Sequence, residues 1–202
     1  DSVTLKDGAV TATAASTITV TDNSDTLTLK STDTDASAGP ILKLSRDNNS
    51  AAASDVVGKI IFTAEDAGNN LTDYAEFLTQ ITDASDGSED VRFIIKGMVG
   101  GNFRKLVDFN TGETSFNDDS DDVDFRVEGN GDANLLFIDA GNDKIGIGTN
   151  APAKLLSLKK DGGGGAIGID IHNQGTDNAD DALITFETQG HRNFSLGIDR
   201  SE

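Results

Sequence analysis

The chain has 202 residues, with 35 Asp or Glu against 16 Lys or Arg, and its formal net charge at pH 7 is −19. This balance argues against nucleic acid and against an anionic membrane surface as partners, because both are bound through clustered cations. Cysteine is absent, which excludes disulfides and thiolate metal sites within the chain.

Apolar and polar residues alternate with a period of two along most of the chain. This pattern predicts strands that bury one face, and the clusters of Gly, Asn, Asp and Ser between them predict turns. The predicted strands are, in chain order, 3–8, 16–22, 25–31, 41–45, 59–64, 90–97, 122–129, 144–149, 166–173, 183–188 and 193–199. We therefore expect an all-β, elongated fold of short antiparallel strands and hairpins.

The segment 69–85 fits two structures. Five of its apolar residues have helical spacing, with Thr72 in position to cap the helix: Leu71, Tyr74, Phe77, Leu78 and Ile81. The alternative is a hairpin, in which 74–83 pairs with 90–97 across a loop that contains a glycine. We favour the hairpin, because the rest of the chain has strand patterns.

Two stretches of the chain, 27–66 and 156–190, resemble each other in order and composition. Leu29 corresponds to Leu158, Leu44 to Ile171 and Phe62 to Phe186, with offsets of 129, 127 and 124 residues. Such self-similarity is typical of modular proteins. We expect a piece of a longer polypeptide with four parts: an N-terminal strand connector (1–25), a first β module (26–115), a Gly/Asp-rich hairpin connector (116–154) and a truncated second β module (155–202).

The acidic run 117–124 is a candidate calcium site, since carboxylate oxygens suit Ca²⁺. Its aspartates are Asp118, Asp119, Asp121, Asp122 and Asp124. The run lacks the EF-hand pattern, because the sixth position from Asp118 is Val123 where that loop has glycine. We favour a solvated acidic turn. The segment 139–144 fails the same test and predicts a β-turn.

The remaining candidate sites are weak. The four glycines 162–165 are not followed by the Lys-Ser/Thr of a phosphate-binding loop, so a flexible loop is favoured. His172 and His191 stand apart in polar surroundings, which favours exposed loop histidines over a zinc site. Sugar-binding surfaces usually need exposed aromatic rings, for which Tyr74 and Phe103 are the loose candidates; we expect both in the core.

No catalytic site is predicted. A Gly-x-Ser-x-Gly nucleophile elbow is absent, and the acidic residues are too numerous to single out a pair for glycoside hydrolysis. No stretch of about 18 apolar residues occurs, so the sequence predicts no membrane insertion. We therefore expect a protein that is not an enzyme and has no catalytic, cofactor or metal residues.

Glycines interrupt the strand 144–149 at Gly146 and Gly148, on one face of that strand. Glycine inside a strand marks a place where another backbone comes close. We expect this face to be approached by a neighbouring chain.

The stretch from Asn134 to Leu158, NLLFIDAGNDKIGIGTNAPAKLLSL, resembles a Gly-Ile-Gly-Thr segment that is common in bacteriophage tail fibres and related virion fibres. The stretches 26–70, 83–98 and 117–129 are similar to repeats in fibre proteins of marine phages. Together these segments cover nearly all of 26–202. The Gly-Ile-Gly-Thr element also occurs in some bacterial surface proteins.

The resemblance implies a homotrimer in which the strands of three chains form intertwined β-prism or β-sandwich-like fibre modules. It also implies a place in the virion, with other tail or capsid proteins and a host glycan or receptor as partners. In such fibres the element often precedes an intramolecular chaperone domain, which this chain lacks; we expect an internal shaft fragment or a mature product. Oligomerisation also suits the composition, because short strands with few large residues bury little surface and leave sheet edges exposed.

Two functions from different classes follow. The first is a structural virion fibre protein, a tail fibre shaft that supports host attachment without catalysis. The second is a carbohydrate- or receptor-binding adhesin module that uses loops such as 50–55 or 162–168. A tailspike depolymerase is a weaker third hypothesis, because the short repeat of a parallel β-helix is not visible.

Overall fold

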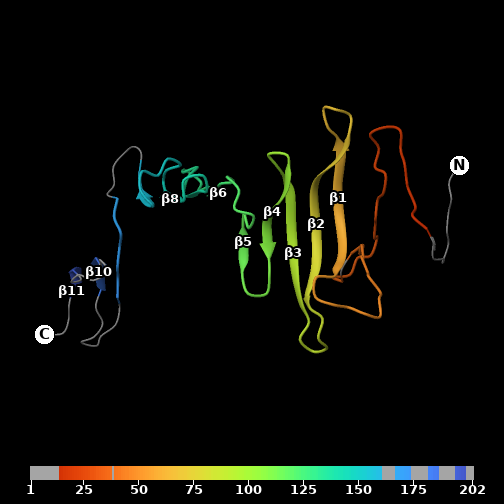
Figure 1. Cartoon of the computed structure of the whole chain (residues 1–202), viewed down its shortest axis with the longest axis horizontal. Coiled ribbons are helices and arrows are strands. Elements are labelled where there is room, and N and C mark those ends of the chain that lie inside the picture. The colour runs from red at the N-terminus through yellow and green to blue at the C-terminus, as the bar shows by residue number, and fades with distance from the viewer. Residues whose placement is uncertain (1–13, 38, 161–166, 174–181, 187–193, 199–202) are drawn as a thin grey trace. The chain divides into compact units, whose positions relative to one another are not determined.

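The computed structural model describes residues 14–37, 39–160, 167–173, 182–186 and 194–198, and its regular elements are all strands (Figure 1). The prediction of an all-β fold is therefore confirmed. The sheets are predominantly antiparallel, and neighbouring strands are mostly consecutive in the chain. Across the described residues, no helix has the length and apolar character needed to cross a membrane.

The largest sheet has five strands in the order β1-β2-β3-β4-β5, a meander in which each strand pairs with the next (Figure 1). Its strands are β1 (Val56–Glu65), β2 (Leu71–Asp83), β3 (Asp90–Val99), β4 (Asn102–Phe109) and β5 (Thr114–Phe116). The prediction of a β2–β3 hairpin over a helix is confirmed, since Phe77 pairs with Ile95 and Ile81 with Val91. The helical spacing of the apolar residues in 69–85 does not produce a helix, because cross-strand pairing outweighs local helix propensity.

Glycines make two of the turns in this sheet. Gly87 (φ 84°) lies in the β2–β3 loop, where Ser88 N–H donates to Ser85 O at 3.0 Å. Gly100 and Gly101 join β3 to β4 with φ of 55° and 80°. Two successive residues with positive φ match the twist of a two-residue hairpin, and glycine adopts that conformation without steric cost.

The second sheet has four short strands in the order β6-β7-β8-β9. Its strands are β6 (Phe125–Val127), β7 (Leu136–Asp139), β8 (Lys144–Ile147) and β9 (Leu156–Leu158). The expected hairpins are present between β6 and β7 and between β7 and β8. β8 and β9, however, are parallel, and β9 lies beyond the predicted hairpin connector 116–154. A separate antiparallel pair is formed by β10 (Ala182–Phe186) and β11 (Phe194–Ile198).

Several predicted strands do not form in the described chain. The segments 16–22, 25–31 and 41–45, and the described part of 166–173, contain no strand. Their side chains alternate as predicted, but a strand also needs a hydrogen-bonded neighbour, and the single chain supplies none to them within the described residues. The predicted strand 3–8 lies outside the described residues.

The core of the described chain is small. Its buried hydrophobic residues are Leu78 and Ile94 in the first sheet and Phe137 in the second, at 4%, 3% and 9% exposure. No described side chain is less than 2% exposed. The chain divides into two compact units, one built mainly on β1–β3 and one on β6–β11, with β4 and β5 contributing residues to both.

The predicted repeat and module limits stay predictions. Phe62 lies in β1 and Phe186 in β10, and each of these strands is the first of an antiparallel pair. The limits at 25, 115 and 154 are not tested by these pairings.

Candidate assembly surfaces and the acidic loop

The first sheet carries a row of phenylalanines on one face. Register places Ile60, Phe77 and Ile95 side by side on β1, β2 and β3. Ring contacts continue the row, with centroids 5.9 Å apart for Phe62–Phe77, 6.2 Å for Phe77–Phe93 and 6.1 Å for Phe93–Phe109. The last two pairs are stacked with nearly parallel rings, at interplanar angles of 18° and 20°.

This phenylalanine row (Phe62, Phe77, Phe93 and Phe109) is only half covered. Its four side chains range from 37% exposed at Phe77 to 52% at Phe62. Ile60 beside them is 44% exposed. Such rings are normally buried in a folded protein, and contiguous exposed apolar surface marks an interaction site. The row is therefore the first candidate assembly surface.

The opposite face of the same sheet holds a buried carboxylate. Glu76 on β2 is 4% exposed, and its oxygens lie 2.9 Å from Lys59 Nζ and 3.3 Å from Lys96 Nζ. Burial alone would raise the pKa of Glu76, but the hydrogen bonds and charges of Lys59 and Lys96 outweigh it and lower the pKa below its ordinary value. The three residues join β1, β2 and β3 through one ionised group.

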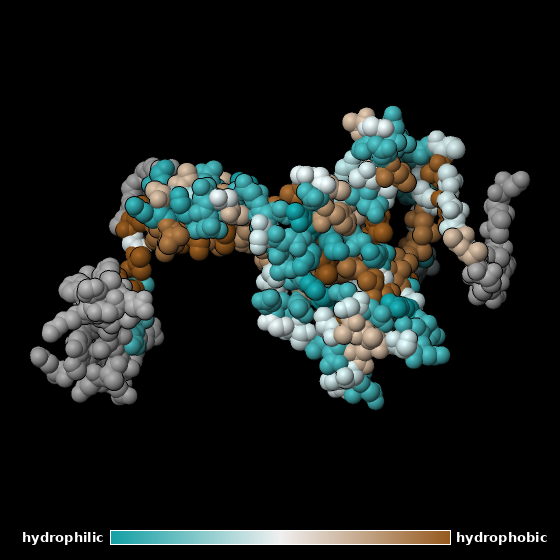
Figure 2. Space-filling view, viewed as in Figure 1, coloured by the Kyte–Doolittle hydropathy of each residue, from teal (hydrophilic) through white to brown (hydrophobic). Residues whose placement is uncertain are grey.

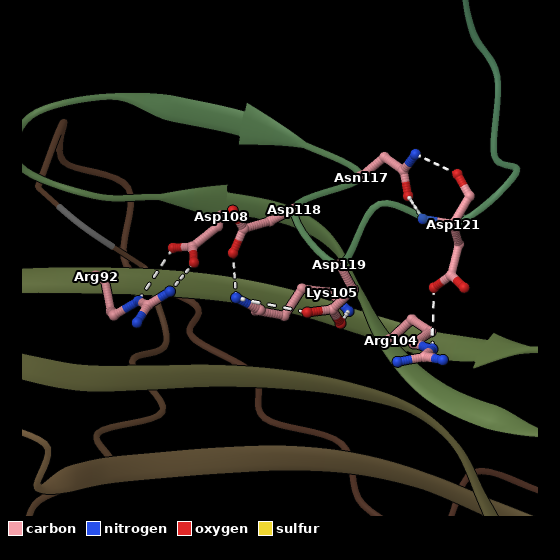
Figure 3. Close-up of polar contacts among 8 residues, drawn as sticks. All are labelled: Arg92, Arg104, Lys105, Asp108, Asn117, Asp118, Asp119 and Asp121. Atoms are coloured by element: carbon pink, nitrogen blue, oxygen red, sulfur yellow. Dashed lines mark hydrogen bonds and ion pairs between the residues drawn. The ribbon is translucent and has the colours of Figure 1, made fainter. Parts of the chain in front are cut away.

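A second ion pair lies on β3 and β4. Arg92 binds the carboxylate of Asp108 through both Nε and Nη2 (Figure 3). Asp108 is 2% exposed. A two-point arginine contact satisfies a buried carboxylate well, and we interpret this pair as structural support for the sheet.

The four-stranded sheet also presents an apolar face. Cross-strand partners share a face, and one row runs Phe125, Ile138, Ile145 and Leu156. Val127 pairs with Leu136, and Ile147 with Leu158, on the same side. Figure 2 shows hydrophobic residues gathered along one side of this unit and hydrophilic residues along the other.

This apolar face of β6–β9 is the second candidate assembly surface. Its exposed members range from 38% at Ile138 to 51% at Leu156. Beside it opens a cavity of about 370 Å³, lined by Leu106, Phe116, Asn117, Val123, Asp124, Phe125, Ile138 and Ala140. The Phe116 and Phe125 rings lie 4.8 Å apart in its wall. Its largely apolar lining extends the face.

The glycines of the Gly-Ile-Gly-Thr element are covered by their own chain. A Cβ on Gly146 would lie 2.1 Å from Thr149 O, and one on Gly148 (φ 72°) would lie 1.9 Å from Lys159 O. The prediction that a neighbouring chain approaches this face is therefore wrong. The loop after β8 folds back across it, and Gly148 N–H donates to Asn134 O at 2.8 Å. Thr149 and Pro152 are buried in this loop.

The acidic loop (residues 117–124) exposes Asp118, Asp122 and Asp124 to solvent, and cations of β4 pair with part of it. Lys105 Nζ pairs with Asp118 and lies 3.6 Å from Asp119 Oδ1, and the Lys105 backbone N–H donates to Asp119 Oδ2 at 2.7 Å (Figure 3). Arg104 Nε lies 3.0 Å from Asp121 Oδ2. Two consecutive cations on β4 therefore bind three of the aspartates.

The backbone of the acidic loop is also held in place. Asn117 (φ 60°) accepts from Asp121 N–H at 3.1 Å and donates to Asp121 O at 2.6 Å (Figure 3). Asp124 accepts from Ala140 N–H at 2.9 Å, which ties the loop to the turn after β7. Within the described residues, no group of three His, Cys, Asp or Glu side chains has an arrangement that could hold a metal ion. We interpret the loop as an internal clamp.

The other predicted candidates fall in separate places. The turn 139–144 forms as predicted, with Asn142 N–H donating to Asp139 and Asp143 at φ 54°. His172 is exposed, whereas His191 and glycines 162–165 lie outside the described residues. Tyr74 is 41% exposed in β2, so its predicted core position is wrong. Phe103 lies half-buried in β4, with Lys96 Nζ 6.0 Å from its ring centroid.

A comparison with known protein families matches none to this chain, and a comparison with curated proteins finds no similar sequence. The assembly surfaces and the acidic loop are thus interpreted from their geometry alone.

Proposed function

We propose that the chain is a structural, non-catalytic segment of a virion fibre, the shaft of a bacteriophage tail fibre, and that it assembles as a homotrimer. The observation that carries the proposal is the pair of uncovered apolar faces, the phenylalanine row and the apolar face of β6–β9. Each belongs to a sheet that lacks a second layer over that face among the described residues. A further copy of the chain would supply that layer.

Burial of these faces can offset the free-energy cost of association. Burying an apolar side chain completely stabilises by about 1.5–3 kcal/mol, so a half-exposed one still has roughly 1 kcal/mol to gain. Ten such side chains stand on the two faces: Ile60, Phe62, Phe77, Phe93, Phe109, Val127, Ile138, Ile145, Ile147 and Leu156. Their combined gain is of the same order as the roughly 4–15 kcal/mol that association costs.

The acidic exterior fits the same role. A net charge of −19 keeps a fibre soluble and discourages contact between fibres, while the two apolar faces carry no charged residue. The resemblance of 26–202 to phage fibre repeats supplies the virion context and the trimeric state. In that context the chain acts as a rigid spacer that holds a host-binding tip away from the particle. It contacts other virion proteins at its ends.

The alternative is an adhesin module that binds a host glycan or receptor. The rings of Phe77, Phe93 and Phe109 form one continuous stacked row with centroids 6.1 to 6.2 Å apart, and aromatic pairs in this range stabilise packed interiors and interfaces. The observed geometry therefore favours a packing layer over a glycan platform.

Binding to host-type polysaccharides separates the hypotheses. The purified chain is passed over immobilised glycans and bacterial surface polysaccharides, and its mass is measured in the same buffer. A shaft predicts no saturable binding and a trimeric mass. Saturable binding would favour the adhesin, and shortening of the polysaccharide would favour a depolymerase.

A further inference from the structure

The sequence contains a single Asn-Gly pair, Asn130–Gly131, and it lies in the connection between β6 and β7. Asparagine and glycine are the residues that the shortest hairpin loops prefer. Here Gly129 N–H donates to Asp132 O at 2.7 Å, so the pair forms the tip of a tight turn. Both residues of the pair are exposed to solvent.

An asparagine followed by glycine can react with its own backbone. The glycine nitrogen attacks Cγ of the asparagine, the Cγ–Nδ2 bond breaks, and ammonia leaves with the proton of the attacking N–H. The product is a five-membered succinimide, which water opens at either carbonyl to give aspartate or isoaspartate. Glycine favours the attack because it has no Cβ to hinder the approach and adopts backbone conformations closed to other residues.

The turn leaves both reacting groups of this pair accessible. Among the described residues, neither the side-chain amide of Asn130 nor the backbone N–H of Gly131 has a hydrogen-bond partner. A Cβ built on Gly131 would have no heavy atom within 4 Å, so the turn is also uncrowded. A hydrogen bond to either group would have to break before the attack, and its absence therefore favours the reaction.

Asparagines in two other turns are held by such hydrogen bonds. The N–H that follows Asn69 belongs to Asn70 and donates to Asp66 Oδ1 at 2.9 Å. The Asn142 amide donates to both carboxylate oxygens of Asp139, at 3.0 and 3.1 Å. The attacking nitrogen is bound in the first turn and the side-chain amide in the second. The turn at Asn130 thus differs from both in its hydrogen bonding as well as in its glycine.

We infer that Asn130 is a site of spontaneous deamidation in the folded chain, with water as the co-reactant and ammonia as the product. The reaction adds one negative charge to a chain of net charge −19, two residues from both Glu128 and Asp132. Isoaspartate also inserts a methylene into the backbone of the turn that the hydrogen bond from Gly129 to Asp132 closes. The modification therefore changes both the charge and the backbone of the β6–β7 connection.

The test follows the purified chain during incubation at mildly alkaline pH, where hydroxide promotes loss of the Gly131 N–H proton. Tandem mass spectrometry of peptides locates each amide that has become a carboxylate, and enzymatic methylation identifies isoaspartate. Asn49 is the internal control, because it is exposed and has no hydrogen-bond partner among the described residues but precedes Ser50. Gly131→Ala is the matched variant, since its added Cβ meets no neighbour in the fold.

We expect Asn130 to deamidate at least about tenfold faster than Asn49, and Gly131→Ala to slow it by a similar factor, which corresponds to about 1.4 kcal/mol in the activation barrier. The rate at Asn130 is expected to be similar in the folded chain and in the chain unfolded by urea, because the turn binds neither reacting group. A folded-state rate more than about tenfold below the unfolded-state rate would show that the turn protects the pair and would overturn the inference. Equal rates at Asn130 and Asn49 in the folded chain would overturn it as well.

Discussion

Gly146 on β8 lies directly beneath the carbonyl of Thr149, so closely that a Cβ at Gly146 would stand 2.1 Å from that oxygen. The contact explains why glycine occupies position 146, the first residue of the Gly-Ile-Gly-Thr element. The chain leaves β8, folds back across its own strand and returns as β9, parallel to β8. Parallel neighbours usually need a crossover of a dozen or more residues. This shorter return depends on glycine, which lets the backbones meet.

Gly146→Ala is therefore expected to destabilise the β6–β9 unit by about 1–3 kcal/mol or more, the usual cost of overpacking. Urea denaturation followed by circular dichroism measures the free energy of unfolding. Gly131→Ala is the matched control, because its added Cβ has no heavy atom within 4 Å and its φ is not positive. Equal stability of the two variants would contradict the observed contact.

Asp119→Ala is expected to loosen the acidic loop, since it leaves the Lys105 backbone N–H without its acceptor and removes one carboxylate from Lys105 Nζ. Leaving a partly buried donor unsatisfied costs about 1–3 kcal/mol. The free energy of unfolding and hydrogen exchange at Lys105 measure the effect. The same change at Asp86, in the exposed β2–β3 loop, is expected to alter stability by less than about 0.5 kcal/mol. Faster exchange in both variants alike would count against the clamp.

Calcium is expected to leave the melting temperature unchanged, because Lys105 and Arg104 of the chain itself bind Asp118, Asp119 and Asp121. A ligand that binds only the folded state raises the melting temperature as its concentration rises. Thermal unfolding is measured with millimolar CaCl₂ and with EDTA. A melting temperature that climbs with CaCl₂ and falls with EDTA would show that the acidic loop, or another site, binds the ion.

The ion pairs of Glu76 are expected to make the folded state less stable in acid. Its folded-state pKa is lowered from 4.5, so its pairing with Lys59 and Lys96 stabilises the fold fully above about pH 4.5 and is lost as pH falls through the folded-state pKa. Glu76→Gln is expected to cost about 1–3 kcal/mol at neutral pH and to flatten the pH dependence below pH 4.5.

The control for Glu76 is Glu89→Gln, an exposed residue in the β2–β3 loop. It is expected to keep both the wild-type stability at neutral pH and the wild-type slope in acid. A Glu76→Gln variant with an unchanged acid slope would show that other carboxylates dominate the transition.

Ile147→Asp places a charge on the apolar face of β6–β9, where the side chain is 41% exposed in the single chain. A residue that remains at the surface tolerates this change, whereas burial at an interface would leave the charge unpaired. We expect the variant to dissociate at concentrations at which the wild type is assembled, as measured by sedimentation velocity. Asn150→Asp adds the same charge at an exposed neighbouring position and is expected to leave the assembly intact.

The sequence predicted strand pairing correctly where both alternating segments belong to one hairpin. The β2–β3 pairing followed from alternation on both sides of a loop that contains Gly87. β4 was missed, because Arg104, Lys105 and Asp108 interrupt its alternation. Those same residues pair with Asp121, Asp119 and Arg92 across neighbouring segments, which alternation alone does not reveal.

The surfaces were harder to predict than the strands. Phe77 and Phe93 could be placed together from the hairpin, since residue 79 pairs with residue 93 and residue 77 with residue 95. Whether that face is covered depends on residues far away in sequence or in another copy. Alternation in 25–31 and 41–45 likewise predicted strands, and these segments have no strand partner among the described residues. Glycines in β8 indicated a close backbone correctly, but the approaching backbone belongs to the same chain.

Solution mass is the most direct test of the central claim that these apolar faces are covered by further copies of the chain. Light scattering coupled to size-exclusion chromatography measures it on the unmodified chain across a hundredfold range of concentration. The proposed fibre segment predicts a mass three times the chain's 21.1 kDa. A mass of 21.1 kDa throughout that range would contradict the claim and show that the faces remain open in the isolated chain.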